Sequence, residues 1–411
     1  MKIGWGIREY SMDVPCNLFG QMYMRISKGI LDPLCVTALV VEGEETVVFV
    51  SVDLEGLSDD LIREAIRAIR EKVPAIREDA VLLNATHSHT AMQIWDSNLV
   101  TPDGFEIYSP KKIRAHMAHQ IAEAVAEAYE KREESGIAFG YGYAVVGHSR
   151  RVVYDTDMSE VLPNKVAPNG HAVMYGNTNR PEFLGYEAGA DHFVNLMYTF
   201  DASDRLTGIV INVPCPSQVS ESYDMQSADY WADVREYVHQ AYGEDVYVLP
   251  QCAAAGDISP RILHYKDAQR RRMALKYNMP YDNTKISENR QGYLNKTMSE
   301  RKDIAERILN AVQEVYGWAK KDIERDLPVR CLRRTVEIHS RMVSDEEAAR
   351  CRENIEKYKA MIEEKKRENL PPEVFNKEVA VLRSCINRNN AALERNRTET
   401  PDAKMTTVIY A

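Results

Sequence analysis

Two histidines separated by one residue are the first candidates for chemistry in this sequence. His87 and His89 follow the apolar run of residues 80–84, which predicts a β-strand. Alternate residues of an extended segment point to the same side, so both imidazoles can face one space at the carboxyl end of the strand. Imidazole is the commonest neutral ligand for zinc, and it titrates near neutral pH. The pattern favours a metal or acid–base site, and surface or loop histidines are the alternative.

Two more strand-like segments lead into residues whose side chains could act as metal ligands or nucleophiles. Residues 207–213 lead into Pro-Cys-Pro-Ser, which contains Cys215, and residues 245–249 lead into a small-residue segment that contains Ser259. In open α/β sheets ligands bind outside the carboxyl ends of strands, so we expect these segments to share one site with the histidines. A Cys215 thiolate would be a good zinc ligand, although a lone cysteine is more often a small buried hydrophobe. The Ser259 hydroxyl could be a nucleophile, and a structural turn capped by Asp257 is the alternative.

Arg150 and Arg151 lie next to each other on an extended segment. Adjacent side chains of a strand face opposite ways, so one guanidinium can enter a cleft and bind an anionic or carbonyl oxygen while the other faces solvent. An ordinary pair of surface arginines is the alternative.

Alternating strands and helices must position these residues. β-branched residues at 36–41 and 46–52 predict neighbouring strands, and apolar residues at helical spacing predict helices over 61–73, 113–131 and 231–242. This alternation is typical of α/β proteins. We therefore expect a mixed, largely parallel β-sheet core flanked by helices.

The carboxyl-terminal part has a different pattern. Residues 343–400 are rich in charge and predict two helices on either side of Pro371-Pro372, which favours an antiparallel hairpin with solvated faces. Residues 401–411 end in a strand-like run that either docks at a sheet edge or continues into a further segment. We therefore divide the chain into a core of residues 1–342, a helical hairpin at 343–400 inserted before a last strand, and the terminal strand of the core at 401–411.

Composition limits the classes of partner. The 411 residues are 44% hydrophobic and 28% charged, which is ordinary for a globular protein, and the net charge of −10 argues against a nucleic-acid binder. Neither an apolar run of the ~20 residues that a membrane helix needs nor an amino-terminal export signal is evident. The seven scattered cysteines then indicate reduced thiols in a cytoplasmic protein. We expect a small-molecule substrate, a homo-oligomer, and neither nucleic acid nor membrane as partner.

Taken together, these segments resemble the neutral, non-lysosomal ceramidase family. The family carries a Thr-His-Thr-His-Ser-like segment after a strand, matched by residues 86–90, and a Gly-Asp-Val-Ser-Pro segment, matched by residues 256–260. An Asn-Arg-Ser-like segment is loosely matched at residues 149–151, and Gly-Gln-Met at residues 20–22 fits the amino-terminal pattern. The resemblance spans residues 3–260 in order, and its two core motifs are fairly specific in combination.

The resemblance implies a zinc hydrolase and roles for individual residues. His87 would be a zinc ligand, His89 would lie in the shell around the substrate, Arg150 would contact substrate, and Ser259 would carry the catalytic hydroxyl. Cys215 stands where the family has its next histidine ligand. A thiolate there keeps a zinc-competent atom but adds negative charge and weakens the Lewis acidity of the metal.

The chain departs from the family in its carboxyl-terminal part. The family's glutamate and tyrosine zinc ligands come from sequence beyond a late strand, and this sequence ends at a comparable strand, residues 406–410. The family's immunoglobulin-like carboxyl domain has no counterpart, and the hairpin at 343–400 is an addition. We expect the missing ligands to come from a carboxyl-terminal segment or a second polypeptide.

The leading hypothesis is a cytoplasmic, ceramidase-like zinc hydrolase that cleaves an amide or related acyl bond in a small polar substrate. Zinc held by His87 and Cys215 would polarise the carbonyl, Ser259 or a water would attack, and Arg150 with His89 would stabilise the oxyanion. Two alternatives remain open. One is a non-catalytic binding or scaffold protein with a degraded metal site, and the other is a metal-free enzyme with Cys215 as nucleophile.

Overall fold

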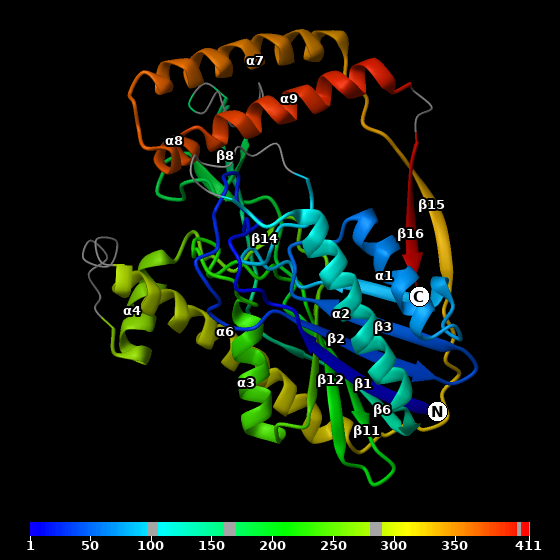
Figure 1. Ribbon diagram of the computed structural model, residues 1–411. Coiled ribbons are helices and arrows are strands. Elements are labelled where there is room, and N and C mark those ends of the chain that lie inside the picture. The colour runs from blue at the N-terminus through cyan, green and yellow to red at the C-terminus, as the bar shows by residue number, and fades with distance from the viewer. Residues whose placement is uncertain (97–105, 160, 162–169, 280–289, 401–403, 411) are drawn as a thin grey trace.

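Two β-sheets packed face to face, each covered by helices on its outer side, form the body of the protein (Figure 1). The computed structural model describes residues 1–96, 106–159, 161, 170–279, 290–400 and 404–410. The α/β class expected from the sequence is confirmed, and the chain builds four layers in the order helix, sheet, sheet, helix.

The first sheet has the strand order β4-β3-β2-β1-β5. Its strands are β1 (Lys2–Glu9), β2 (Cys35–Glu42), β3 (Thr46–Val52), β4 (Val81–Ala85) and β5 (Glu133–Glu134). Helices α1 (Asp59–Lys72) and α2 (Pro110–Glu130) cover its outer face, and the short helix η1 (Glu78–Ala80) precedes β4. The Ser58 side chain caps the first turn of α1 by accepting from the backbone N–H of Leu61.

The second sheet has the strand order β13-β12-β11-β6. Its strands are β6 (Gly136–Tyr143), β11 (Phe193–Phe200), β12 (Leu206–Val213) and β13 (Tyr247–Cys252). Helices α3 (Tyr230–Tyr242) and α6 (Arg290–Ala319) cover its outer face. α4 (Lys266–Tyr277) lies beside α6.

The share of parallel pairing is smaller than the sequence led us to expect. Only two pairs within the described strands are parallel, β3 with β4 and β12 with β13, and the remaining neighbours are antiparallel. The reason is the length of the connections, because a parallel pair needs a long crossover whereas short turns join β2 to β3 and β11 to β12 as hairpins. Helices α1 and α3 lie within the two crossovers. Both parallel pairs place their carboxyl ends at the same side of the molecule.

Alternate strand residues face the two sides of each sheet, and both sides are buried. One face of β2 packs on α1 and α2, while Leu39 and Val41 face the second sheet together with Ile3 and Trp5. The indole N–H of Trp5 donates to Thr199 Oγ1 across the interface at 3.0 Å. Burial of this kind contributes about 2 kcal/mol for each large apolar side chain and fixes the two sheets against each other.

Short strands and loops gather beyond the carboxyl ends of the two parallel pairs. β7 (His148–Ser149) pairs antiparallel with β14 (Ile258–Ser259). A three-stranded sheet of β8 (Arg151–Tyr154), β9 (Ala172–Met174) and β10 (Phe183–Tyr186) follows β7. These small elements carry Arg150 and Ser259 to one region of the molecule.

The predicted carboxyl-terminal hairpin is present. α7 (Asp345–Lys366) and α9 (Ala380–Thr398) pack against each other across the short α8 (Pro372–Glu378), shown in orange and red in Figure 1. β16 (Lys404–Tyr410) pairs antiparallel with β15 (Arg333–His339) and joins neither large sheet, which differs from the expected terminal strand of the core. Residues 401–403 and 411 of that segment lie outside the described residues. Among the described helices, none combines the length and apolar character of a membrane span.

Candidate metal and hydrolytic site

The parallel pair β3 and β4 brings the predicted histidines beside a carboxylate. Beyond the strand ends the ladder continues, because the N–H of Thr86 donates to Val52 O and the N–H of Ser88 donates to Leu54 O, both at 3.0 Å. Glu55 and His87 therefore lie side by side, Glu55 after the end of β3 and His87 after the end of β4. The nearest ligand atoms of Glu55, His87 and His89 all lie within 4.8 Å of one another.

The His87 ring is held with one nitrogen available. Its Nδ1 lies 2.5 Å from the backbone oxygen of Glu55, and since a carbonyl only accepts, Nδ1 carries the proton and Nε2 keeps its lone pair. Burial, the neighbouring His89 and Arg150 lower the pKa of His87 to about 4, so the ring is neutral at pH 7. The backbone of His87 has φ of 59°, a left-handed conformation that is uncommon outside glycine and asparagine and that often marks functional sites.

The His89 ring has the same arrangement and is buried. Its Nδ1 lies 2.9 Å from a carboxylate oxygen of Glu221, and the residue is 9% exposed. Its Nε2 is buried and has no hydrogen-bond partner among the described residues. Burial acts to raise the pKa of Glu221, but the hydrogen bond from His89 and the charge of Arg261 lower it below its usual range. The charged Glu221 therefore holds a proton on Nδ1, so in the neutral ring the lone pair lies on Nε2.

These donors fit a bound metal ion. Two imidazole Nε2 atoms and a carboxylate suit zinc and other first-row transition metals, and imidazole ligands usually donate their second N–H to a carboxylate or backbone oxygen. Both histidines have that partner. An unpartnered buried Nε2 costs free energy that coordination would recover. Burial raises the pKa of Glu55, although the nearby His89 acts to lower it.

Cys215 does not belong to this group. Its side chain is fully buried in the apolar cluster between the second sheet and helices α3 and α6, and its thiol contacts the backbone oxygen of Pro216 at 3.6 Å. Burial, with Cys252 and Asp229 nearby, raises the pKa of the Cys215 thiol well above its usual range. The thiolate that either a ligand or a nucleophile requires is therefore disfavoured, and His89 supplies the second ligand atom of the group instead.

Ser259 and Arg150 meet through two residues that sequence reasoning missed. The Gln218 side-chain amide donates to Ser259 Oγ at 2.9 Å and to the Tyr175 hydroxyl at 3.0 Å. Arg150 donates to the same hydroxyl at 3.3 Å and to the backbone oxygen of Gly256 at 2.6 Å. Ser259 and Gln218 are fully buried, and Gln218 Oε1 has no partner among the described residues.

Glu221 and Arg261 connect this network to the histidines. One oxygen of Glu221 accepts from His89, and the other accepts from the guanidinium of Arg261. Arg261 and Arg150 each lie 5.8 Å from the centre of the Tyr175 ring. Three of the predicted site residues, His89, Arg150 and Ser259, are therefore linked in one polar network. The His87 ring lies against the His89 ring, with 5.0 Å between their centres, and Cys215 lies outside the network.

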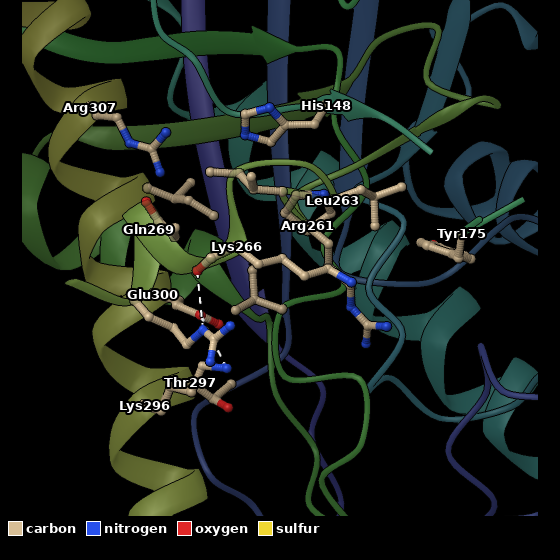
Figure 2. A pocket seen from close by; sticks show the side chains of 15 residues that line it. His148, Tyr175, Arg261, Leu263, Lys266, Gln269, Lys296, Thr297, Glu300 and Arg307 are labelled. Carbon is tan, nitrogen blue, oxygen red and sulfur yellow. Dashed lines mark hydrogen bonds and ion pairs between the residues drawn. The ribbon is translucent and has the colours of Figure 1, made fainter. Parts of the chain in front are cut away.

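A cavity of about 460 Å³ opens beside Ser259. Pro260 and Arg261, which follow the serine directly, form part of its wall, and α4 and α6 form the opposite side (Figure 2). Figure 2 shows Arg261 between Tyr175 on one side and Glu300 of α6 on the other. A small molecule in this cavity would lie next to the network around Ser259.

Comparison with solved structures identifies the fold. The chain is similar to neutral ceramidase from Pseudomonas aeruginosa with a TM-score of 0.58 and 16% sequence identity, over 82% of this chain and 47% of that one. A structure of ceramidase complexed with C2 gives a TM-score of 0.55 and 15% identity, over 82% and 46%. No protein-family model and no curated protein matches the sequence. The protein therefore has a ceramidase-like fold, as the sequence resemblance implies, and spans about half the length of these ceramidases.

Proposed function

We propose that this chain is a metal-dependent hydrolase of an amide or related acyl bond in a small polar substrate. The observation that carries the proposal is the pair of imidazoles that have Nδ1 already bonded and that form, with the Glu55 carboxylate, one group of possible metal ligands. A structural pair of histidines has no need for three ligand atoms within 4.8 Å of one another. The ceramidase-like fold and the network around Ser259 support the same reaction class.

Zinc is the metal we propose, with His87, His89 and Glu55 as its ligands within this chain. Bound zinc would polarise a carbonyl oxygen and lower the pKa of water in its coordination sphere toward ~7. The chain's own contribution is to orient both rings, through the Glu55 backbone oxygen and the Glu221 carboxylate. A further ligand from a second polypeptide or a carboxyl-terminal segment stays a prediction, as does a homo-oligomer.

Ser259 is the nucleophile that we propose for the acyl carbon. Its Oγ accepts from the Gln218 amide at 2.9 Å and from the N–H of Arg261 at 3.3 Å, and donors of this kind stabilise an oxygen that loses its proton. Arg150 and Tyr175 lie on the other side of Gln218, where they can donate to the substrate's developing oxyanion. Gln218 Oε1 offers a buried acceptor for a substrate N–H, which suits an amide.

A reducing compartment remains our proposal for its location. The seven cysteines, all among the described residues, are thiols outside any disulfide, which is typical of cytoplasmic proteins.

The experiment that tests the function is a hydrolysis assay over a panel of N-acylated small molecules. Purified protein should release amine from part of the panel, and a chelator or the His87→Ala variant should abolish that release. His119→Ala is the matched control, since this exposed histidine lies on α2. Binding without hydrolysis, unchanged by Ser259→Ala and His87→Ala, would instead favour a non-catalytic binding protein.

A further inference from the structure

The cavity beside Ser259 collects positive charge. Its lining contains five basic side chains and one carboxylate, Glu300. The basic residues are Arg261, Lys266, Arg270, Lys296 and Arg307. They come from the loop after Ser259, from the first turns of α4, and from α6 (Figure 2). The whole chain carries a net charge of −10, so this concentration of cations runs against the overall charge of the protein.

The two lysines of the lining have few ion-pair partners. Lys266 has no ion pair among the residues that the structure describes, and Lys296 Nζ lies 3.8 Å from its only such partner, Glu300. Burial raises the pKa of Glu300, the single carboxylate in the lining, and Lys296 and Arg261 act to lower it. Burial together with Arg307 and His192 lowers the pKa of His148 to about 4, so this lining histidine is neutral at pH 7.

The arginines are anchored from behind by acids outside the lining. Arg307 pairs with the fully buried Asp303 at 3.0 Å, and Arg261 pairs with Glu221. These ion pairs use part of each guanidinium, and each guanidinium has five N–H donors. The anchors therefore fix the direction of the arginines and leave donors for an anion.

We infer that this cavity binds an anionic group of the substrate, a carboxylate or a phosphate, while the acyl bond lies at Ser259. The inference rests on the proposed function and adds the substrate class, an N-acyl compound with a negatively charged end. Arg261 is common to both regions, because its backbone N–H contacts Ser259 Oγ and its side chain lines the cavity. Charge-assisted hydrogen bonds from several cations favour such a group over a neutral or purely apolar one.

Matched pairs of substrates test the inference. N-acetyl-L-glutamate is compared with the neutral N-acetyl-L-glutaminamide for a carboxylate, and N-acetyl-O-phosphoethanolamine with N-acetylethanolamine for a phosphate. The measurement is kcat/KM for each member with the wild type, with the double variant Lys266→Met/Lys296→Met, and with Lys302→Met. Lys302 is an exposed lysine of the same helix α6 and is not part of the lining, so it is the matched control.

We expect the wild type and Lys302→Met to prefer the anionic member of at least one pair by about tenfold or more. The double variant should lose that preference because its kcat/KM with the anionic members falls. The pair that shows the preference identifies carboxylate or phosphate. Equal kcat/KM for both members of each pair, or a preference that the double variant retains, would overturn the inference and leave the hydrolase proposal intact.

Calorimetric binding separates failure of the inference from failure of the function. Where no compound is hydrolysed, N-acetyl-L-glutamate and inorganic phosphate are titrated into wild type and both variants. Binding that the double variant loses and Lys302→Met keeps supports an anion site in a protein that is no amidase. Absence of binding by the wild type overturns the anion site.

Discussion

The Nδ1 atom of His89 lies 2.9 Å from a carboxylate oxygen of Glu221, and the opposite nitrogen of the same ring has no partner among the described residues. The carboxylate holds the proton on Nδ1, and His89 forms one group of possible metal ligands with His87 and Glu55. The metal ion that we propose would supply the partner that this buried nitrogen lacks.

Replacement of Glu221 tests the orientation of His89. Glu221→Gln keeps the size of the side chain but removes the charge that selects the tautomer, so we expect zinc affinity to fall by about 10- to 100-fold. The measurement is competition with a zinc indicator dye. Glu187→Gln is the control because Glu187 pairs with Arg151, outside the histidine network. Equal zinc affinity of the wild type and Glu221→Gln would argue against an orienting role.

A glycine behind His89 offers a second test of the same ring. Gly20 has φ of +108°, and an added Cβ would lie 2.5 Å from Cγ of the His89 ring. Gly20→Ala should therefore displace the imidazole and weaken zinc binding, by about tenfold or more. Gly189→Ala is the control, since a Cβ there meets nothing within 4 Å. Calorimetric zinc titration of both variants would contradict the packing argument if Gly20→Ala bound as tightly as Gly189→Ala.

Ser259→Ala separates the chemical step from metal binding. We expect kcat for the best N-acyl substrate to fall by about 10³ while zinc content stays at the wild-type level, because the serine supplies the nucleophile and no ligand. Ser203→Ala, in an exposed turn between β11 and β12, should behave as the wild type. Retention of substantial activity by Ser259→Ala would show that water rather than the serine attacks.

The gathering of polar residues at the strand ends was predictable from sequence. Most of the residues that contact them there were not. Apolar runs that end in His87 and Ser259 indicated two strand ends, and parallel pairing placed polar residues at one edge. Glu55 follows its strand as a single carboxylate without a motif, so only the β3–β4 pairing reveals it. Gln218 and Glu221 lie in the segment between β12 and α3, whose path depends on tertiary contacts.

The direction of the Cys215 side chain could not be predicted from the sequence. Its place after a strand and between two prolines predicted a rigid ligand, but side-chain direction decides the outcome, and this one points into the core beneath α3 and α6. The sheets are also less parallel than expected, because short connections make hairpins of β2–β3 and of β11–β12.

Asp303 provides a stability test beneath the basic cavity. Its buried carboxylate accepts two hydrogen bonds from Arg272 at 2.7 Å and one from Lys276 at 2.8 Å. Asp303→Asn keeps the shape but leaves these cations without their counter-charge, so we expect a loss of about 3 kcal/mol in the free energy of unfolding at pH 7. Urea denaturation measures it, with the exposed Asp322→Asn as control.

The pH dependence of that loss follows from the pKa of Asp303. Burial acts to raise the pKa, but Arg272 and Lys276 lower it below the ordinary aspartate value of about 3.9. The contribution of the carboxylate is therefore complete above about pH 4 and is lost as pH falls through the lower folded-state value. The difference between wild type and Asp303→Asn should shrink below pH 4, and a difference that stays constant down to pH 2 would contradict the assignment.

The most direct test of the account is zinc binding by single-ligand variants of metal-stripped protein. We predict about one zinc per chain for wild type, His119→Ala and Cys215→Ala, and at least tenfold weaker binding for His87→Ala and His89→Ala, with circular dichroism spectra unchanged. Zinc binding by His87→Ala as tight as that of the wild type would contradict the proposed metal centre. Loss of binding by Cys215→Ala together with retention by His89→Ala would replace the ligand set with His87 and the buried thiol.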